Sequence, residues 1–125
     1  MIIGIGTDIA RVARFERAIE RHGERFVTRL LGEDERSDFH GRGGAANYLA
    51  KRFAAKEAFV KALGTGLRHG MRWTEIQVVN DALGRPALRL SGRAEELATA
   101  SGVGALHVSL SDEAEFAVAF VVLEA

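Results

Sequence analysis

The sequence predicts an α+β fold in which an antiparallel sheet packs against one long central helix. Residues 44–63 are rich in alanine, leucine and long charged side chains and contain no proline, which is typical of a helix. Residues 2–9 and 105–111 alternate in polarity and residues 116–123 form an apolar run, and both patterns are typical of strands. In chain order the segments give one strand, several helices, two strands, a short helix and two strands, which favours this fold class.

Length and composition indicate a single domain spanning residues 1–125. Its 47% hydrophobic and 27% charged residues are ordinary for a globular domain that buries its own core. A formal net charge of zero predicts no nucleic acid or membrane partner, and the absence of cysteine excludes thiol catalysis and cysteine metal sites. The apolar start is interrupted at Asp8 and lacks a basic leader, and no stretch approaches the roughly 20 apolar residues of a membrane span. We therefore expect a cytoplasmic protein.

The first predicted strand, residues 2–9, has two different faces. Branched residues on one face alternate with Gly4, Gly6 and Asp8 on the other. The glycines indicate that another backbone or a ligand approaches that face closely. Asp8 lies where the strand is expected to pass into a helix, so it either caps that helix or faces an open site.

The segments that follow are predicted helices, and the first of them carries a stripe of arginines. Residues 10–22 form a helix ending near Gly23, residues 24–40 form two short helices around Gly32, and residues 41–46 form a loop. The arginines on one side of the first helix are Arg11, Arg14, Arg17 and Arg21. This stripe is either a solvated face with Glu–Arg pairs or a docking surface for an acidic partner.

The long helix carries two pairs of charged residues, each spaced one turn apart. Glu57 and Lys61 lie beside an apolar arc and next to several alanines, which would leave room for a bulky ligand. Such Glu–Lys pairs are also common on exposed helix surfaces. Arg52 and Lys56 project into the apolar arc, where two like charges repel each other unless an anion lies between them. Gly64 is expected to end the helix.

The C-terminal half is predicted to supply the remaining strands. Strands at residues 75–80 and 87–90 flank a turn signal at residues 81–86, and a short helix reaches from Ser91 to about Ala100. The last apolar run is expected to be a central strand or one buried in a subunit contact, because both of its faces are apolar.

Three separate blocks of the sequence resemble those of the 4′-phosphopantetheinyl transferases, in particular their short single-domain type. The central block runs from Arg52 to Ala62 and reads Arg-Phe-Ala-Ala-Lys-Glu-Ala-Phe-Val-Lys-Ala. The others are Ile5-Gly-Thr-Asp-Ile near the N-terminus and His107-Val-Ser-Leu-Ser near the C-terminus. The blocks occur in the family's order at suitable distances, and the match covers about residues 1 to 124. Three ordered blocks are far more specific than any one of them.

The resemblance implies a magnesium-dependent transferase. In that family, 4′-phosphopantetheine passes from coenzyme A to a serine of an apo acyl carrier protein, in fatty acid biosynthesis, and 3′,5′-ADP is released. The resemblance implies that Asp8 and Glu57 hold Mg²⁺ and that Lys61 meets the phosphates, so these three are the expected catalytic residues. It leaves the proton acceptor open between Glu57 and a metal-bound water.

The resemblance also implies binding residues and an assembly. The residues expected to contact coenzyme A are Arg52, Lys61, Gly64, Gly84, Pro86, His107 and Ser109. The residues expected to contact the acidic carrier protein are Arg14, Arg21, Arg25 and Phe26. The expected assembly is a homotrimer with its active site at the subunit boundary.

Two other functions would use the same residues. A small magnesium-dependent phosphohydrolase acting on nucleotides would need the same carboxylates and cations. A non-catalytic interaction domain would use the arginine helix to dock an acidic partner. Release of 3′,5′-ADP from coenzyme A without an acceptor would favour the first, and absence of metal-dependent coenzyme binding would favour the second.

Overall fold

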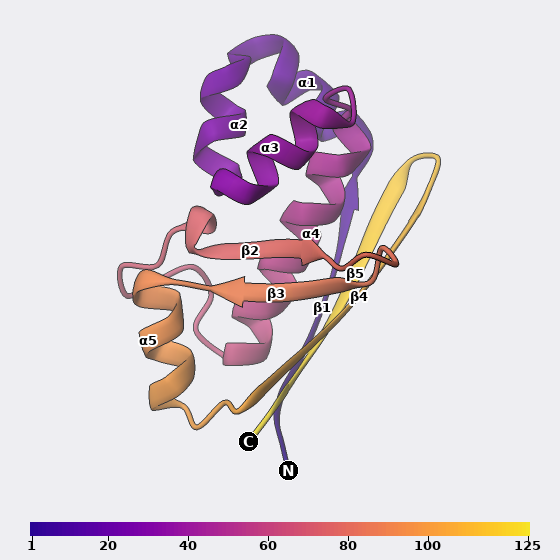
Figure 1. The fold of residues 1–125 in the computed structure, drawn as a ribbon. Helices are drawn as coiled ribbons and strands as arrows, with labels where there is room; N and C mark the ends of the chain where they lie inside the picture. Colours follow the sequence, from indigo (N-terminus) through magenta and orange to yellow (C-terminus); the bar gives the residue numbers. More distant parts are fainter.

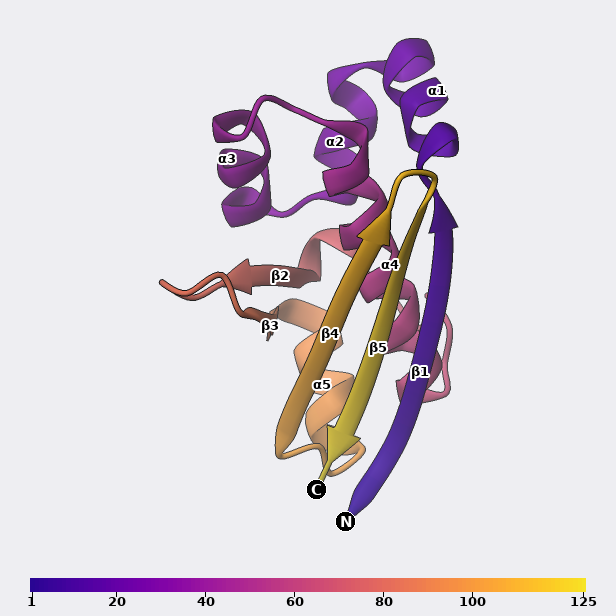
Figure 2. The same ribbon diagram turned by 90° about the vertical axis from the view of Figure 1, so that its right-hand side faces the viewer.

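Helix α4 (Ala46–Leu63) is the element against which the rest of the chain is arranged. The computed structural model describes all 125 residues. The other elements, in chain order, are β1 (Ile2–Arg11), α1 (Val12–His22), α2 (Glu24–Leu30), α3 (Glu33–Gly41), the short 3₁₀ helix η1 (Trp73–Glu75), β2 (Ile76–Asn80), β3 (Pro86–Leu90), α5 (Gly92–Ala100), β4 (Ala105–Glu113) and β5 (Phe116–Glu124). A three-stranded sheet lies along α4, and helices α1 to α3 gather at one end of the molecule (Figure 1, Figure 2). The predicted α+β class is confirmed.

The main sheet is antiparallel with the strand order β1–β5–β4, so the last strand of the chain is the central one. The prediction of a central strand at residues 116–123 is confirmed. One face of β5 is buried against α4 through Ala117, Ala119, Val121 and Leu123. On the opposite face, Val118 and Phe120 remain 38% and 46% exposed. The sheet is therefore covered on one face only, and β2 and β3 form a separate hairpin.

The small residues of β1 and α4 bring two backbones into direct contact. A Cβ atom added to Gly4 would lie 1.9 Å from the carbonyl oxygen of Ala62, and one added to Gly6 would lie 1.9 Å from that of Ala58. The close approach predicted for the glycine face is thus made by a backbone. The prediction that the alanines of α4 leave room for a ligand is wrong, because the strands of the sheet fill that space and Ala54 and Ala58 are completely buried.

Strand β1 continues beyond its predicted end, and this changes the interpretation of Asp8. The strand reaches Arg11, and α1 begins at Val12, two residues later than predicted. Arg11 is the residue that precedes the helix, and no side chain caps the N-terminus of α1. The alternative in which Asp8 caps the helix is therefore wrong. Asp8 lies opposite the buried Ala119 of β5, so its side chain is on the face of the sheet that meets α4.

The predicted conflict between Arg52 and Lys56 is resolved by carboxylates of α3. Lys56 is completely buried, and its Nζ donates a hydrogen bond of 2.7 Å to Glu35 Oε1. Arg52 lies 3.7 Å from the carboxylate of Asp38, and its guanidinium carbon is 4.2 Å from the ring centroid of Tyr48. Both cations therefore have internal partners, and no ligand phosphate is needed to explain their spacing.

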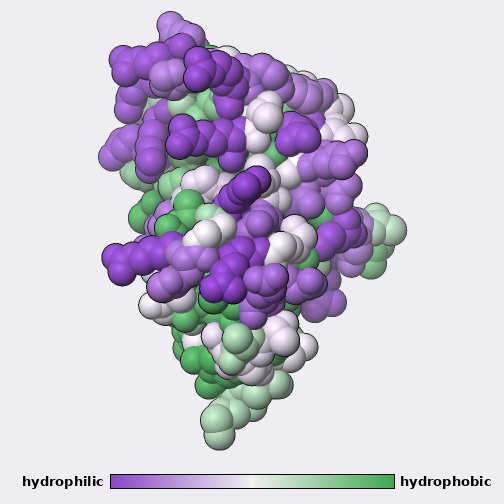
Figure 3. Space-filling model, turned by 90° about the vertical axis from the view of Figure 1, so that its left-hand side faces the viewer, coloured by the Kyte–Doolittle hydropathy of each residue, from purple (hydrophilic) through white to green (hydrophobic).

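The two ends of the chain meet at one end of the sheet, and the other end of the molecule has a hydrophilic surface. The amide of Ala125 donates a hydrogen bond of 2.9 Å to the carbonyl of Met1, and both termini lie at the same end of the sheet (Figure 1). Hydrophilic side chains crowd the opposite end of the molecule, over the N-terminal helices (Figure 3). Not one of the helices is both long and apolar enough to pass through a bilayer.

Candidate active site and partner groove

Asp8, Glu57 and Lys61 come together where β1 passes over α4. The Nζ of Lys61 donates hydrogen bonds to Asp8 Oδ1 at 3.0 Å and to the carbonyl oxygen of Thr7 at 3.1 Å. The Asp8 side chain is only 15% exposed, whereas that of Lys61 is 51% exposed. Glu57 lies one helical turn before Lys61 on the same side of α4. Two carboxylates and one ammonium thus meet at a partly open edge of the sheet.

The electrostatic balance at this cluster is set by burial and by the charges around Glu57. Burial, and then the charge of Asp8, raise the pKa of Glu57 above its ordinary value. The charges of Lys61 and Arg14 lower the pKa of Glu57 and offset part of that increase. Ionisation of Glu57 is therefore less favourable in this fold than in water, and an additional cation at the cluster would stabilise the ionised form.

Glu57→Gln is expected to make the metal-free protein more stable at pH 7. The pKa of Glu57 is higher in the folded protein than its ordinary value of 4.5. The free energy of unfolding therefore falls as the pH rises from 4.5 through the folded-state pKa. Glutamine removes that loss, so its melting temperature should exceed that of wild type by a few degrees at most, since the group is partly screened by solvent. The difference should shrink as the pH falls towards 4.5 and vanish below it. Thermal unfolding in EDTA at several pH values measures this, and a pH-independent difference would contradict it.

The donor set of this cluster fits a hard divalent cation. No group of three or more His, Cys, Asp or Glu side chains gathers anywhere in the chain, so a site made wholly of protein ligands is not available. Magnesium commonly uses one or two carboxylates and completes its octahedron with water and substrate oxygens. Asp8 and Glu57 supply that number, and the ammonium of Lys61 already occupies a cation position against Asp8. The residues present therefore fit magnesium.

Of the residues expected to contact coenzyme A, Lys61 belongs to this cluster, whereas most of the others lie elsewhere in the chain. His107 and Ser109 lie opposite Val122 and Phe120 of β5, so they are on the exposed face of the sheet, away from Asp8. Gly64 has a left-handed conformation at the end of α4. Gly84 and Pro86 are in the β2–β3 hairpin, whose tip projects away from the sheet in Figure 2.

Arg52 differs from the other expected coenzyme contacts because it is almost completely buried. Its side chain is 4% exposed, and its Nε has no hydrogen-bond partner. Asp38, which faces Arg52 at 3.7 Å, also accepts a hydrogen bond of 2.9 Å from Arg42. These bonds place Arg52 between α3 and α4 and not at the open surface.

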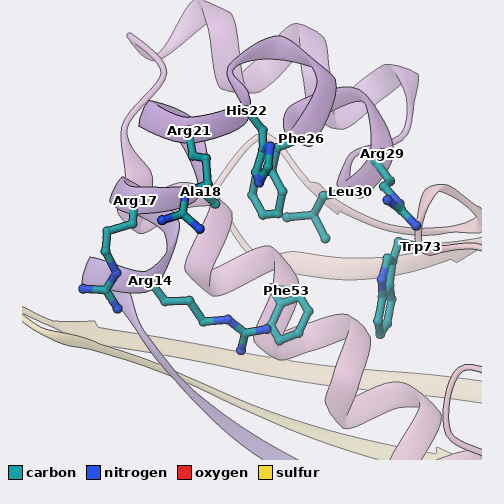
Figure 4. A pocket seen from close by; sticks show the side chains of 10 residues that line it. All are labelled: Arg14, Arg17, Ala18, Arg21, His22, Phe26, Arg29, Leu30, Phe53 and Trp73. Atoms are coloured by element: carbon teal, nitrogen blue, oxygen red, sulfur yellow. The ribbon is translucent and has the colours of Figure 1, made fainter.

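A groove with an apolar floor and a basic rim lies between α1, α2 and α4. It encloses about 540 Å³. Figure 4 shows the side chains that line it, which are Arg14, Arg17, Ala18, Arg21, His22, Phe26, Arg29, Leu30, Phe53 and Trp73. We call it the arginine groove. Its apolar floor and cationic rim fit an amphipathic surface that carries negative charge.

Arg14 and Phe53 connect the arginine groove to the carboxylate cluster. The guanidinium carbon of Arg14 is 4.8 Å from the ring centroid of Phe53, a cation–π contact (Figure 4). Phe53 lies one turn before Glu57 on α4, so the floor of the groove and the carboxylate are neighbours on one helix. A protein held in the groove can thus present a side chain to the cluster.

The structure brings together three of the four residues expected to contact a carrier protein, in a groove that other residues also line. Arg14, Arg21 and Phe26 line the groove, whereas Arg25 lies outside it, next to Glu24. The lining residues that the sequence analysis did not assign to a partner are Arg17, Ala18, His22, Arg29, Leu30, Phe53 and Trp73. The sequence does contain a signal for Arg17, because it belongs to the same arginine stripe as Arg14.

Comparison with known proteins gives consistent matches over the whole chain. The model of the 4′-phosphopantetheinyl transferase superfamily matches residues 4–121. The holo-[acyl-carrier-protein] synthase of Halorhodospira halophila is 55% identical over 123 residues, which is 98% of each chain. The crystal structure of the synthase from Neisseria meningitidis has a TM-score of 0.92 at 43% identity and covers 100% of both chains. That from Bacillus anthracis, in complex with CoA (3′,5′-ADP), has a TM-score of 0.82 at 39% identity, covering 98% of this chain and 96% of that one.

The matched fold and the matched family model define the class of protein as a phosphopantetheinyl transferase enzyme. Within that superfamily, the chain belongs to the holo-[acyl-carrier-protein] synthases. The family resemblance of the three sequence blocks is thereby confirmed.

Proposed function

We propose that this protein transfers 4′-phosphopantetheine from coenzyme A to a serine of an apo acyl carrier protein, in a magnesium-dependent reaction of fatty acid biosynthesis. The observation that carries the proposal is the meeting of Asp8, Glu57 and Lys61 directly beside the arginine groove. Family membership supports the reaction, and the Bacillus anthracis relative was solved with CoA (3′,5′-ADP).

In this reaction Asp8 and Glu57 would hold the magnesium ion. When bound, the metal neutralises charge on the diphosphate and orients it. The ammonium of Lys61 is half exposed and reaches the same edge, so it can donate to a phosphate oxygen as a point charge. Positioning and charge neutralisation are the main requirements of phosphoryl transfer, and a cluster without a nucleophilic side chain can satisfy them.

The transfer is balanced without a further reactant. The serine oxygen forms a bond to the β-phosphorus of coenzyme A, the bond from that phosphorus to the oxygen of 3′,5′-ADP breaks, and the hydroxyl proton leaves. Glu57 is a candidate to accept that proton, because its carboxylate is one of the two that the cluster supplies.

The decisive experiment supplies the purified protein with magnesium, coenzyme A and an apo acyl carrier protein. Mass spectrometry of the carrier should show a phosphopantetheine-sized increment that depends on magnesium. A second reaction without the carrier tests for a nucleotide phosphohydrolase, which would release 3′,5′-ADP without an acceptor. Release without an acceptor and no increment on the carrier would overturn the proposal.

The arginine groove is proposed to receive the carrier protein, which is acidic. Arg14, Arg21 and Phe26 would contact it from α1 and α2, and Trp73 and Phe53 would form the apolar floor. Arg25, outside the groove, would make at most a peripheral contact. Rim charges of this kind act mainly on the rate of encounter.

Arg21→Ala is expected to raise the Michaelis constant for the carrier several-fold and to leave coenzyme A binding unchanged. An exposed rim charge contributes about 1 kcal/mol or less and is screened by salt, so added salt should shrink the difference from wild type. Arg25→Ala serves as the comparison, because it removes the same charge outside the groove. Steady-state kinetics at two salt concentrations measure the effect. Equal losses for both substrates would mean that Arg21 supports the fold.

The exposed face of the main sheet is proposed to bind further copies of the chain in a homotrimer. Ile5, Ile9 and Phe120 are 55%, 64% and 46% exposed on this face, an unusual concentration of apolar surface. His107 and Ser109 lie on the same face. Copies that meet there would bring His107 and Ser109 to a subunit boundary. Arg52, although buried, stays among the residues proposed to contact coenzyme A.

Phe120→Asp is expected to dissociate the assembly and to reduce transfer by at least about tenfold, because a charge would be buried in an apolar contact. Leu67→Asp is a suitable control, since Leu67 is 37% exposed in the loop after α4. Sedimentation velocity at micromolar concentration measures the assembly. A wild-type chain that is an active monomer would remove the trimer from the proposal.

A further inference from the structure

One buried ion pair has no part in the chemistry described above. Glu35 of α3 is 1% exposed and Lys56 of α4 is completely buried, although charged residues are rarely buried to this extent. Lys56 immediately precedes Glu57, yet its side chain points to the opposite region of the fold, between α3 and β2. Taking two charges out of water costs several kcal/mol per ion, so such a pair gives little net stability.

The pair joins four separate segments by hydrogen bonds. The Nζ of Lys56 donates to Glu35 Oε1 at 2.7 Å, to the carbonyl of Trp73 at 2.8 Å and to that of Ile76 at 2.6 Å. The carboxylate of Glu35 also accepts from the amides of Gly32 at 3.0 Å and Val78 at 2.9 Å. All three ammonium donors have partners, so the directions of these bonds fix the positions of α3, α4, η1 and β2 relative to each other.

Trp73 connects this buried pair to the surface of the protein. Trp73 belongs to a short 3₁₀ helix that follows the loop after α4, and no sheet pairing holds it. Its ring lies 5.5 Å from that of Phe53, and both rings line the arginine groove (Figure 4). The Lys56 bond to the Trp73 carbonyl is therefore the connection between the buried pair and the floor of the groove.

We propose that the buried Glu35–Lys56 pair positions the carrier-binding groove, because the Lys56 ammonium holds the Trp73 backbone so that its ring packs against Phe53. The inference rests on the proposed function in one respect, the identity of the protein that enters the groove. Lys56 and Glu35 are positioning residues: they touch neither substrate. Their loss should weaken binding of the carrier and leave binding of coenzyme A and metal unchanged.

The test uses Lys56→Met, which keeps the length of the side chain and removes the ammonium, and the milder Glu35→Gln. Leu123→Ala is the control, because Leu123 is completely buried at the far end of the sheet and its truncation lowers stability without touching the groove. Trp73 is the only tryptophan in the chain, so its fluorescence reports on this one position. Acrylamide quenching, the Michaelis constant for an apo acyl carrier protein, kcat and the affinity for coenzyme A are measured for each variant.

In Lys56→Met we expect Trp73 to become more accessible to acrylamide and the Michaelis constant for the carrier to rise by about tenfold, as for loss of one central interface contact. The value of kcat and the affinity for coenzyme A should stay within about twofold of wild type. Glu35→Gln should also raise the accessibility of Trp73 and the Michaelis constant for the carrier, but by less. It decides the question if Lys56→Met does not fold. Unchanged quenching, or an equal rise in Leu123→Ala, would overturn the inference. If wild type shows no transfer at all, the proposed function fails, while the quenching result still tests the link from Lys56 to Trp73.

Discussion

Asp8→Ala and Glu57→Ala are each expected to reduce the transfer rate by at least about a thousandfold, which is the scale of losing a main electrostatic contact to the reacting group. Each variant removes one of only two carboxylates at the cluster, and Lys61 cannot replace a metal ligand. The fold should persist, because neither side chain belongs to the apolar core. Transfer is measured at limiting magnesium, and the fold by circular dichroism.

The same variants should also lose magnesium binding, which is measured directly by calorimetry in the presence of coenzyme A. Asp8→Asn and Glu57→Gln are the matched controls, because they preserve shape and remove only the charge. Near wild-type turnover of either alanine variant at limiting magnesium would show that the metal is held elsewhere.

Gly6→Ala is expected to destabilise the protein by about 3 kcal/mol or more, at the upper end of overpacking effects. The added methyl group would lie 1.9 Å from the carbonyl oxygen of Ala58, and neither backbone can move without separating β1 from α4. Because β1 carries Asp8 and α4 carries Glu57, the variant should also lose activity beyond its loss of stability.

Urea denaturation measures the effect of Gly6→Ala, and Gly41→Ala is the control. Gly41 is the last residue of α3, and a Cβ added there would meet nothing within 4 Å. Its replacement should be neutral or slightly stabilising, because alanine is the better helix former. Similar stabilities for the two variants would contradict the direct contact between β1 and α4.

Most of the fold was predictable from local pattern. Helix-forming composition predicted α4, alternation of polarity predicted β1 and β4, and the continuous apolar run predicted β5 as the central strand, although only one of its faces is covered within the chain. The ends of elements were less predictable. Strand β1 continues to Arg11 because pairing with β5 decides its length, and that partner lies more than a hundred residues away in sequence.

The candidate site was predictable only in part, since the sequence does not show which partners fold together. Asp8, Glu57 and Lys61 were found through the resembled blocks, and the structure brings them together. The alanine face of α4 was misinterpreted, because small residues accommodate a neighbouring backbone as readily as a ligand. The partners of Lys56 could not be foreseen, since Glu35 lies 21 residues earlier on a different helix.

The central position of β5 has a consequence for how the chain is made. Strand β5, which joins β1 to β4, follows β1 by about a hundred residues, so β1 must wait for it with both edges unpaired. At about 5–20 residues per second, the roughly one hundred residues between them take on the order of 5–20 s to emerge. During that time Ile5 and Ile9 have neither strand partner nor sheet, and the nascent chain is most exposed to aggregation before β5 is available for pairing.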